Sequence, residues 1–431
     1  MAKWMATYEY NSVETPHPAG PTHKPRSIKE IDVPESFLED IALKILYLSG
    51  SLSVLELAEK IGLSYEVAYE LYYRLRAHIF CQTSGMLANI PLIAITSQGR
   101  LQAMEQLSRC QYAGVAPVSL ESYVEQIRKQ SALKAEVHAD DVKRAFAHLV
   151  VDDQTLRQFG TALNSGSSIF LYGPPGVGKT TMAEVLSRVL AEDAVWIPYA
   201  LEVDSQIITV YDPTIHKRAP ELEPESRDAR WVLCHRPAVL VGGELTADML
   251  DLQFSPVSNF YVAPAQMKAN NGVLIIDDFG RQRIHPDELL NRWVVPLDRK
   301  IDFLTLAGGK KIEIPFEMLV VFASNMDPAE LLDPCFQRRI QTKIKIGAAS
   351  DEQFCEIFRR VAAEHRVAYD PGIPNDLIET IRGTLHQELR SCYPRDIVNQ
   401  ACWAARYEGR KPYLDRAALK QAVDAYFLKP V

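Results

Sequence analysis

The chain has 431 residues, of which 47% are hydrophobic and 24% are charged, ordinary values for a folded globular protein. This composition argues against a disordered, collagenous or coiled-coil chain, and the length predicts about three domains. Lysine and arginine number 47 and aspartate and glutamate 55, so the net charge is -8 and the molecule as a whole has no electrostatic attraction for nucleic acid.

The seven cysteines are scattered and form no C-x-x-C pair, which predicts buried thiols in a reducing compartment and no metal site. The first ten residues lack the apolar stretch of a secretory signal. The most apolar runs, such as residues 318–323, are far shorter than the roughly 20 residues that cross a bilayer. We therefore expect a cytoplasmic protein that does not enter a membrane.

Residues 1–34 are expected to form a disordered or extended arm, since residues 11–34 contain five prolines and no periodicity. Residues 35–110 predict three helices, a hairpin and a fourth helix. The helix starts are capping residues Ser36, Ser53, Ser64 and Thr96, the hairpin strands are residues 79–81 and 92–95 around Ser84-Gly85, and the last helix presents Leu101, Met104 and Leu107. This order resembles a winged helix-turn-helix domain.

The third of these helices would be the recognition helix, and its charges disfavour DNA. Its first turns carry Tyr65, Glu66 and Glu70, and arginines come only later, at Arg74 and Arg76. Phosphates are repelled by such a surface. We expect this domain to contact protein, with nucleic-acid binding or a purely structural role as the alternatives.

The rest of the chain divides into three segments that differ in their pattern of apolar residues. Residues 111–138 predict a linker with one short helix. Residues 139–347 alternate buried strands with helices, which is typical of an α/β domain with a parallel sheet. Within them, the acidic stretch 221–230 is expected to be a solvated loop. Residues 348–431 predict a helical domain.

The strongest motif is a glycine-rich loop between a strand-like run at residues 168–172 and a helical run at 182–190. It fits G-x-x-x-x-G-K-T, which in this context predicts a P-loop. Glycine lets the main chain approach phosphate oxygens, and N–H groups at the helix N-terminus point at the β-phosphate. The lysine can bridge the β- and γ-phosphates, and the last threonine of the motif can bind Mg²⁺. The predicted nucleotide-binding residues are Gly173, Pro174, Pro175, Gly176, Val177, Gly178, Lys179, Thr180 and Thr181.

A second motif, residues 272–278, is an apolar strand that ends in Asp277 and Asp278. Buried parallel strands have this pattern, and ligands bind at their carboxyl ends. We expect Asp277 to hold Mg²⁺ through water, and Asp278 to orient or deprotonate the water that attacks the nucleotide.

A third buried run, residues 318–323, ends in Ser324 and Asn325. A polar amide at the tip of a strand next to the P-loop strand can hold the attacking water or the γ-phosphate, so Asn325 is the first candidate and Ser324 the reserve. Arg338 and Arg339 follow on a short helix. Adjacent arginines are usually surface charge, but this pair is placed to reach the nucleotide of a neighbouring subunit.

Together these motifs resemble an AAA+ ATPase over residues 140–428, with Tyr393-Pro394-Arg395-Asp396 in the helical tail. The resemblance implies an α/β nucleotide-binding domain, an all-α lid and Mg-ATP as ligand, bound at the subunit interfaces of a ring-like homo-oligomer, in this family a hexamer. It implies magnesium ligands Thr180 and Asp277, the catalytic residues Lys179 and Asp278, sensors Asn325 and Arg395, and the arginine finger Arg339, with Arg338 as the alternative.

Residues 301–315 alternate apolar and polar residues around Gly308-Gly309, which predicts a hairpin. A hairpin just before the first sensor is similar to the branch that contains MoxR-like ATPases. Residues 231–258 are a candidate second insertion. Such insertions commonly face a central pore, so the hairpin tip, residues 304–310, is a candidate contact for a client protein.

The chain departs from the family pattern at Asp278, where most members carry glutamate. Because positioning errors near 1 Å can cost about 100-fold in rate, we expect slow ATP turnover. The function predicted from the sequence is ATP-driven remodelling or assembly of a protein partner. The alternatives are a DNA-directed regulator or loader that uses the winged helix, and an ATP-gated assembly switch.

Overall fold

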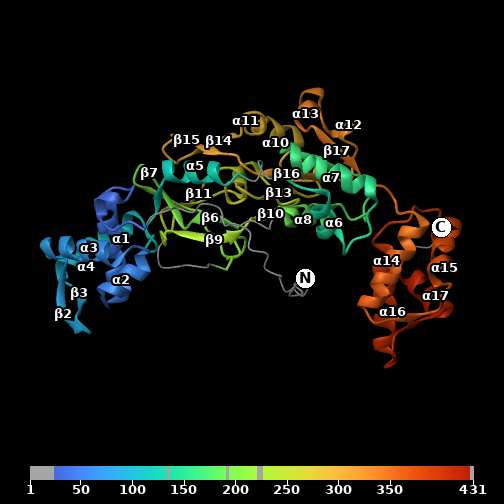
Figure 1. Ribbon diagram of the computed structural model, residues 1–431, viewed down its shortest axis with the longest axis horizontal. Helices are drawn as coiled ribbons and strands as arrows, with labels where there is room; N and C mark the ends of the chain where they lie inside the picture. The colour runs from blue at the N-terminus through green and yellow to red at the C-terminus, as the bar shows by residue number, and fades with distance from the viewer. Residues whose placement is uncertain (1–23, 132, 134–135, 191–193, 221–226, 428–431) are drawn as a thin grey trace.

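The computed structural model describes residues 24–131, 133, 136–190, 194–220 and 227–427. An N-terminal domain and a helical C-terminal domain lie at opposite ends, with sheets between them (Figure 1). Within these ranges, no helix has both the length and the hydrophobicity needed to span a bilayer.

The N-terminal domain contains the four expected helices: α1 (Glu35–Ser49), α2 (Val54–Ile61), α3 (Tyr65–Ala77) and α4 (Ser97–Arg109). The expected cap at Ser36 is wrong, because Ser36 lies inside α1, which begins after Pro34 without a side-chain cap. Strands β1 (Ser51–Ser53), β2 (Cys81–Leu87) and β3 (Ile90–Ile95) form an antiparallel sheet in the order β1-β3-β2. Ser53 and Glu56 form the capping box that begins α2. Together with Ser64 and Thr96, it shows that side-chain caps mark the starts of α2, α3 and α4.

Two further details of this domain differ from the sequence-based expectation. The hairpin turns at Ala88 and Asn89, both with positive φ, and Ser84-Gly85 instead lies where the β2–β3 register shifts. Leu101 and Met104 are 71% and 55% exposed, because α4 packs through its smaller residues Gly99 and Ala103. The periodicity identified the helix but not its buried face.

Both segments expected to be arm or linker are partly built into the core. Residues 1–23 of the arm lie outside the described ranges, but Ile28–Glu30 form a 3₁₀ helix, and Ile28, Ile31 and Val33 are buried. In the expected linker, β4 (Val118–Ser119) joins a sheet, and α5 (Leu120–Lys129) buries Tyr123 and Ile127. Burial of these apolar side chains is the physical reason for both differences.

The α/β domain contains a five-stranded parallel sheet in the order β10-β13-β16-β5-β17. Alternate residues of the three central strands face two separate hydrophobic clusters; for example, Ile276 and Phe322 belong to one, and Ile275 and Val321 to the other. Helices cover both faces, as expected for the predicted fold class. The strands are β5 (Ile169–Tyr172), β10 (Ala238–Val241), β13 (Val273–Ile276), β16 (Leu319–Ser324) and β17 (Thr342–Lys345), and the flanking helices include α6 (Ala139–Phe146), α7 (Asp153–Ser165), α8 (Lys179–Val189), α10 (Pro286–Arg292) and α11 (Val294–Arg299).

A further group of strands, which we call the β subdomain, shares one hydrophobic cluster with α5. One sheet has the order β11-β12-β8-β7-β4, and two pairs are β6–β9 and β14–β15. Of the candidate insertion 231–258, β9 and β11 belong here, but β10 lies in the parallel sheet. The strands are β6 (Ala194–Pro198), β7 (Ala200–Val203), β8 (Gln206–Thr209), β9 (Trp231–His235), β11 (Gln253–Ser255), β12 (Phe260–Val262), β14 (Ile301–Thr305) and β15 (Lys311–Pro315).

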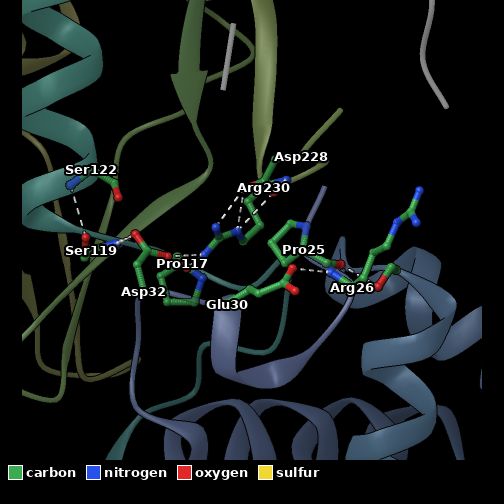
Figure 2. Close-up of polar contacts among 10 residues, drawn as sticks. Pro25, Arg26, Glu30, Asp32, Pro117, Ser119, Ser122, Asp228 and Arg230 are labelled. Carbon is green, nitrogen blue, oxygen red and sulfur yellow. Dashed lines mark hydrogen bonds and ion pairs between the residues drawn. The ribbon is translucent and has the colours of Figure 1, made fainter. Parts of the chain in front are cut away.

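The junction between the N-terminal domain and the β subdomain is built on a buried ion network (Figure 2). Arg230, 5% exposed, pairs with Asp228 at 2.7 Å and with Asp32 at 2.5 Å, and donates to the carbonyl oxygen of Pro117 at 3.2 Å. Asp32 also accepts a hydrogen bond from the Ser119 N–H at 2.8 Å. The solvated loop expected at 221–230 is therefore wrong at its end, because Asp228 and Arg230 are buried; residues 221–226 lie outside the described ranges.

The C-terminal domain is helical, as expected, apart from a two-residue strand pair, β18 (Ala368–Tyr369) and β19 (Tyr413–Leu414). Its helices pack around one hydrophobic cluster. They are α14 (Asp351–Glu364), α15 (Ile373–Glu379), α16 (Tyr393–Tyr407) and α17 (Arg416–Tyr426), with the π-helical turn Thr380–Thr384 after α15. Two short helices, α12 (Pro328–Leu331) and α13 (Pro334–Arg339), connect β16 to β17.

Candidate active site

The glycine-rich loop joins β5 to α8, and its shape depends on glycine. Gly173, Gly176 and Gly178 have φ angles of 148°, 81° and 95°. A Cβ at Gly173 would lie 2.0 Å from the carbonyl oxygen of Ile346. Val177 is buried in the core and anchors the loop. The loop is thereby held directly before the N-terminus of α8, where unpaired N–H groups favour an anion.

Lys179, the first residue of α8, holds three acceptors at once. Its ammonium donates hydrogen bonds to the carbonyl oxygens of Gly173 at 3.0 Å and Pro174 at 2.9 Å, and to Asn325 Oδ1 at 2.7 Å. Burial lowers the pKa of this ammonium, and the nearby carboxylates of Asp277 and Asp278 oppose that shift. A desolvated cation at this point can exchange such neutral acceptors for phosphate oxygens.

Thr180 lies beside the carboxylate at the end of β13. Its hydroxyl is 2.9 Å from both carboxylate oxygens of Asp277. One hydroxyl and one carboxylate are a fitting protein contribution to a Mg²⁺ site, because this ion keeps several waters and takes its other ligands from phosphates. Within the described ranges, no group of three or more histidine, cysteine, aspartate or glutamate side chains could hold a metal alone.

Asn325 connects Lys179 to the second carboxylate. Strand β16 lies between β5 and β13, so the residue after β16 projects between the P-loop and the aspartates. The Asn325 side-chain amide donates to Asp278 Oδ1 at 2.8 Å while its oxygen accepts from Lys179. The reserve candidate Ser324 is 1% exposed and donates to the Phe279 carbonyl oxygen, so its hydroxyl is occupied in the fold.

Asp278 has a left-handed backbone, with φ of 50°. Aspartate tolerates this region better than most residues. The next turn is held by a residue that the sequence reasoning missed: Gln282 donates to the Asp277 carbonyl oxygen at 2.7 Å and accepts from the Gly280 N–H at 2.8 Å. No sequence motif marked Gln282, because its role depends on how this turn folds.

The two candidate finger arginines differ in their surroundings. The Arg339 side chain is 12% exposed, pairs with Asp298 at 2.9 Å and lies over the ring of Phe336. Arg338 is exposed and makes no hydrogen bond or ion pair with any residue that the structure describes. Among the described residues, no hydrogen bond or ion pair joins either arginine to the P-loop group.

The helical domain meets the P-loop just before α16. The Cys392 N–H donates to the Gly176 carbonyl oxygen at 3.0 Å, and the side chain of Arg390 lies beside the same glycine. The sequence reasoning did not single out Arg390. Arg395, which the resemblance implied as the second sensor, has a side chain that is 53% exposed and lies 3.6 Å from Asp396.

The expected hairpin is present as β14–β15, but most of its tip is packed. Leu304 and Leu306 are buried in the β subdomain, and the Ala307 N–H donates to the Tyr261 hydroxyl at 2.7 Å. Lys310 pairs with Asp204 of the β7–β8 turn. Only residues 307–310 remain exposed as a candidate client contact.

The known proteins that resemble this chain are only distantly similar to it. Residues 350–425 match a family described as a domain of unknown function, DUF8689, and no curated protein matches the sequence. RuvB from Thermotoga maritima, described as a Holliday junction branch migration motor, is 15% identical with a TM-score of 0.36, covering 68% of this chain and 72% of that one. NtrX from Brucella abortus in complex with ADP is 14% identical with a TM-score of 0.39, covering 63% and 54%.

Proposed function

We propose that this protein is an AAA+ ATPase that binds and hydrolyses Mg-ATP to remodel or assemble a protein partner. The observation that carries the proposal is the hydrogen-bonded row Lys179–Asn325–Asp278 beside the Thr180–Asp277 pair. These residues come from the carboxyl ends of the adjacent parallel strands β13 and β16 and from the start of α8, which the P-loop joins to the next strand, β5. A P-loop, a cation, two carboxylates and an amide at one edge are the parts that phosphoryl transfer to water requires.

Each residue has a distinct role in this proposal. Main-chain N–H groups of residues 176–181 bind the phosphates, and Lys179 turns from the loop carbonyls to the phosphate oxygens. Thr180 and Asp277 would hold Mg²⁺, which neutralises phosphate charge when bound. Asp278 orients the attacking water and accepts its proton. Asn325 keeps the Asp278 carboxylate in place through its 2.8 Å hydrogen bond.

The site is completed, in this proposal, by an arginine from a second copy in a ring-like homo-oligomer. Arg338 suits that role better than Arg339, because Arg338 is exposed and unpaired among the described residues while Arg339 is held by Asp298. This reverses the preference drawn from the sequence. An arginine supplied by a neighbour can raise phosphoryl-transfer rates by about 1,000-fold or more.

A protein client for the N-terminal domain is favoured by the chemistry of its hairpin. Residues 79–99 contain no charged residue, and Met86 and Leu87 near the hairpin turn are 64% and 63% exposed. Phosphate contacts need cations, whereas exposed apolar side chains favour protein contacts. The slow ATP-gated switch remains the second candidate, because the Asp278 side chain is short.

The test is the ATPase rate per subunit, with Mg²⁺, over a range of protein concentrations. We expect a rate that rises with concentration, and a small fraction of Arg338→Ala protein that lowers the rate of the mixture by more than its share. Arg339→Ala is the matched control and should perturb the mixture less. A rate independent of concentration, and indifferent to both variants, would remove the shared site and favour the switch.

A further inference from the structure

Strand β13 ends in an extra residue. Its register with β16 pairs Ile276 with Phe322. Continued regularly, that register would let the Asp278 N–H donate to the Ala323 carbonyl oxygen. The Phe279 N–H makes that hydrogen bond instead, at 2.8 Å, and Asp278 before it has a left-handed backbone with φ of 50°. Asp278 is therefore inserted in the manner of a β-bulge, a feature that changes the direction of a side chain.

The side-chain amide of Gln282 closes the turn that follows this bulge. Its nitrogen donates to the Asp277 carbonyl oxygen at 2.7 Å, and its oxygen accepts from the Gly280 N–H at 2.8 Å. The neighbouring strand β10 ends at Val241, so Gln282 supplies the donor for the Asp277 carbonyl oxygen where the ladder stops. A side-chain amide can donate and accept in this way, whereas an ionised carboxylate can only accept.

The Asp278 carboxylate is thus controlled from two sides. Gln282 fixes the main chain before and after it, at Asp277 and Gly280. The side-chain amide of Asn325 donates directly to Asp278 Oδ1 at 2.8 Å. Among the described residues, no hydrogen bond joins Gln282 to the carboxylate itself, so Gln282 can act on it only through the main chain. The Asn325 hydrogen bond forms where the bulge places the carboxylate, and therefore depends on Gln282.

Gln282 holds this turn from outside the hydrophobic core. It is half-buried and lines a cavity of about 570 Å³ between the segments that follow β13 and β16. Ser324, by contrast, donates to the next carbonyl oxygen, that of Phe279, and is 1% exposed. A substitution at Gln282 therefore removes hydrogen bonds from the turn without opening a gap in the core, and it can test the bulge separately from the packing.

We propose that Gln282 is a positioning residue for ATP hydrolysis, because it holds the bulge that directs the Asp278 carboxylate towards the attacking water. The inference rests on the proposed function, and it adds a residue that acts through Asp278 and not on the nucleotide. Within the described part of the chain, no hydrogen bond joins Gln282 to Lys179 or Thr180, so nucleotide binding should not depend on it. The rate should, since a displacement near 1 Å can cost about 100-fold.

The experiment measures single-turnover hydrolysis and Mg-ATP affinity of the full chain with Gln282→Met, which keeps the side-chain length and loses both hydrogen bonds. The rate should fall by at least about tenfold, while the dissociation constant stays within about twofold. Asn164→Leu is the matched control, because Asn164 also holds main chain with both atoms of its amide, at Val137. It should leave the rate and the affinity near the wild-type values. Thermal melting shows whether each variant is folded.

A second comparison tests whether Gln282 acts through Asp278. In an Asp278→Asn background, Gln282→Met should lower the residual rate by less than about twofold, because the carboxylate that it positions is already absent. An equal tenfold loss in the two backgrounds would overturn the proposal, since Gln282 would then act independently of Asp278. So would a tenfold loss of Mg-ATP affinity in Gln282→Met.

The outcomes separate this inference from the proposed function. If the wild-type chain hydrolyses ATP and Gln282→Met does so at the same rate, the positioning role is wrong and the proposed function stands. If the wild-type chain does not hydrolyse ATP, both fail. Should Gln282→Met not fold, Gln282→Glu replaces it, because this variant keeps the shape and loses the donor to the Asp277 carbonyl oxygen. A wild-type rate in Gln282→Glu would equally contradict the proposal.

Discussion

The molecule contains two polar clusters, each built around a buried cation, that serve different purposes. At the P-loop, Lys179 donates to two main-chain carbonyls and to Asn325, neutral acceptors that phosphate oxygens can replace. At the junction, Arg230 is enclosed by the carboxylates of Asp32 and Asp228 and by the Pro117 carbonyl. Lys179 can exchange its partners for a ligand, whereas Arg230 is neutralised by its own carboxylates. Substitutions at the P-loop should therefore reduce activity, and substitutions at the junction should reduce stability.

The largest effect is expected for Lys179→Ala. ATP turnover should fall by at least about 100-fold, because a preorganised charge on the phosphates is lost. Stability should change by no more than about 1 kcal/mol, because the lysine's hydrogen bonds are to neutral acceptors. Phosphate release and thermal melting check the two parts. Lys143→Ala, an exposed lysine on α6, is the control, and turnover by Lys179→Ala within a few-fold of it would contradict the proposed site.

Arg230→Met should have the reverse profile. Removing the arginine leaves two carboxylates at the junction without their shared cation, which should cost about 3 kcal/mol or more in the free energy of unfolding. Turnover per folded molecule should stay near that of the wild type. Urea denaturation measures the loss, and Arg109→Met, which breaks only the exposed pair with Glu105, should cost less than about 1 kcal/mol. Equal losses in the two variants would contradict the structural role of Arg230.

The Asp32→Asn variant tests the junction cluster through the pH dependence of its stability. Burial alone would raise the pKa of the Asp32 carboxyl, but the charge of Arg230 and hydrogen bonds from Ser122 and Ser119 hold it well below its usual range. Because the folded-state pKa lies below the unfolded value, this carboxylate contributes its full stabilisation above about pH 4 and loses it as the pH falls through the folded pKa. The variant should be about 2 kcal/mol less stable than the wild type at pH 7.

That stability difference should shrink as the pH is lowered from 5 towards 2, which urea denaturation at each pH measures. A difference that is the same at every pH would mean that the loss comes from packing and not from the charge.

The smallest effect is expected for Asp278→Glu, a substitution in the P-loop cluster. The added methylene should raise turnover by up to about tenfold if the shorter side chain limits the rate. The left-handed backbone at this position, with φ of 50°, should cost glutamate about 1 kcal/mol of stability. Single-turnover hydrolysis and thermal melting measure the two effects. An unchanged rate would show that the backbone already compensates for the short side chain.

Much of the fold could be predicted because its signals are local. Capping pairs such as Ser53 and Glu56 mark helix starts, and the P-loop, Asp277, Asp278 and Asn325 each follow a recognisable buried run. Their proximity also follows from a general rule, since the carboxyl ends of parallel strands share one edge.

The remaining features depend on distant residues. Arg230 lies in an acidic stretch that is typical of a loop, and its partner Asp32 is 198 positions away in the sequence. Arg390 belongs to no sequence motif, and only the packing of the helical domain on Gly176 places it beside the P-loop. Leu101 and Met104 had the expected spacing, but small residues on the other side of α4 allowed the closer packing.

The way residues 111–138 are woven into the molecule limits how this chain can be shortened or recombined. A protein that began at residue 139 would lack β4, which pairs with β7, and Gln130, whose amide donates to the Trp196 carbonyl oxygen and to Asn271. Its sheet would gain an open edge, and buried polar groups would lose their partners. A shortened or recombined chain that keeps the β subdomain would therefore have to keep residues 111–138 with it.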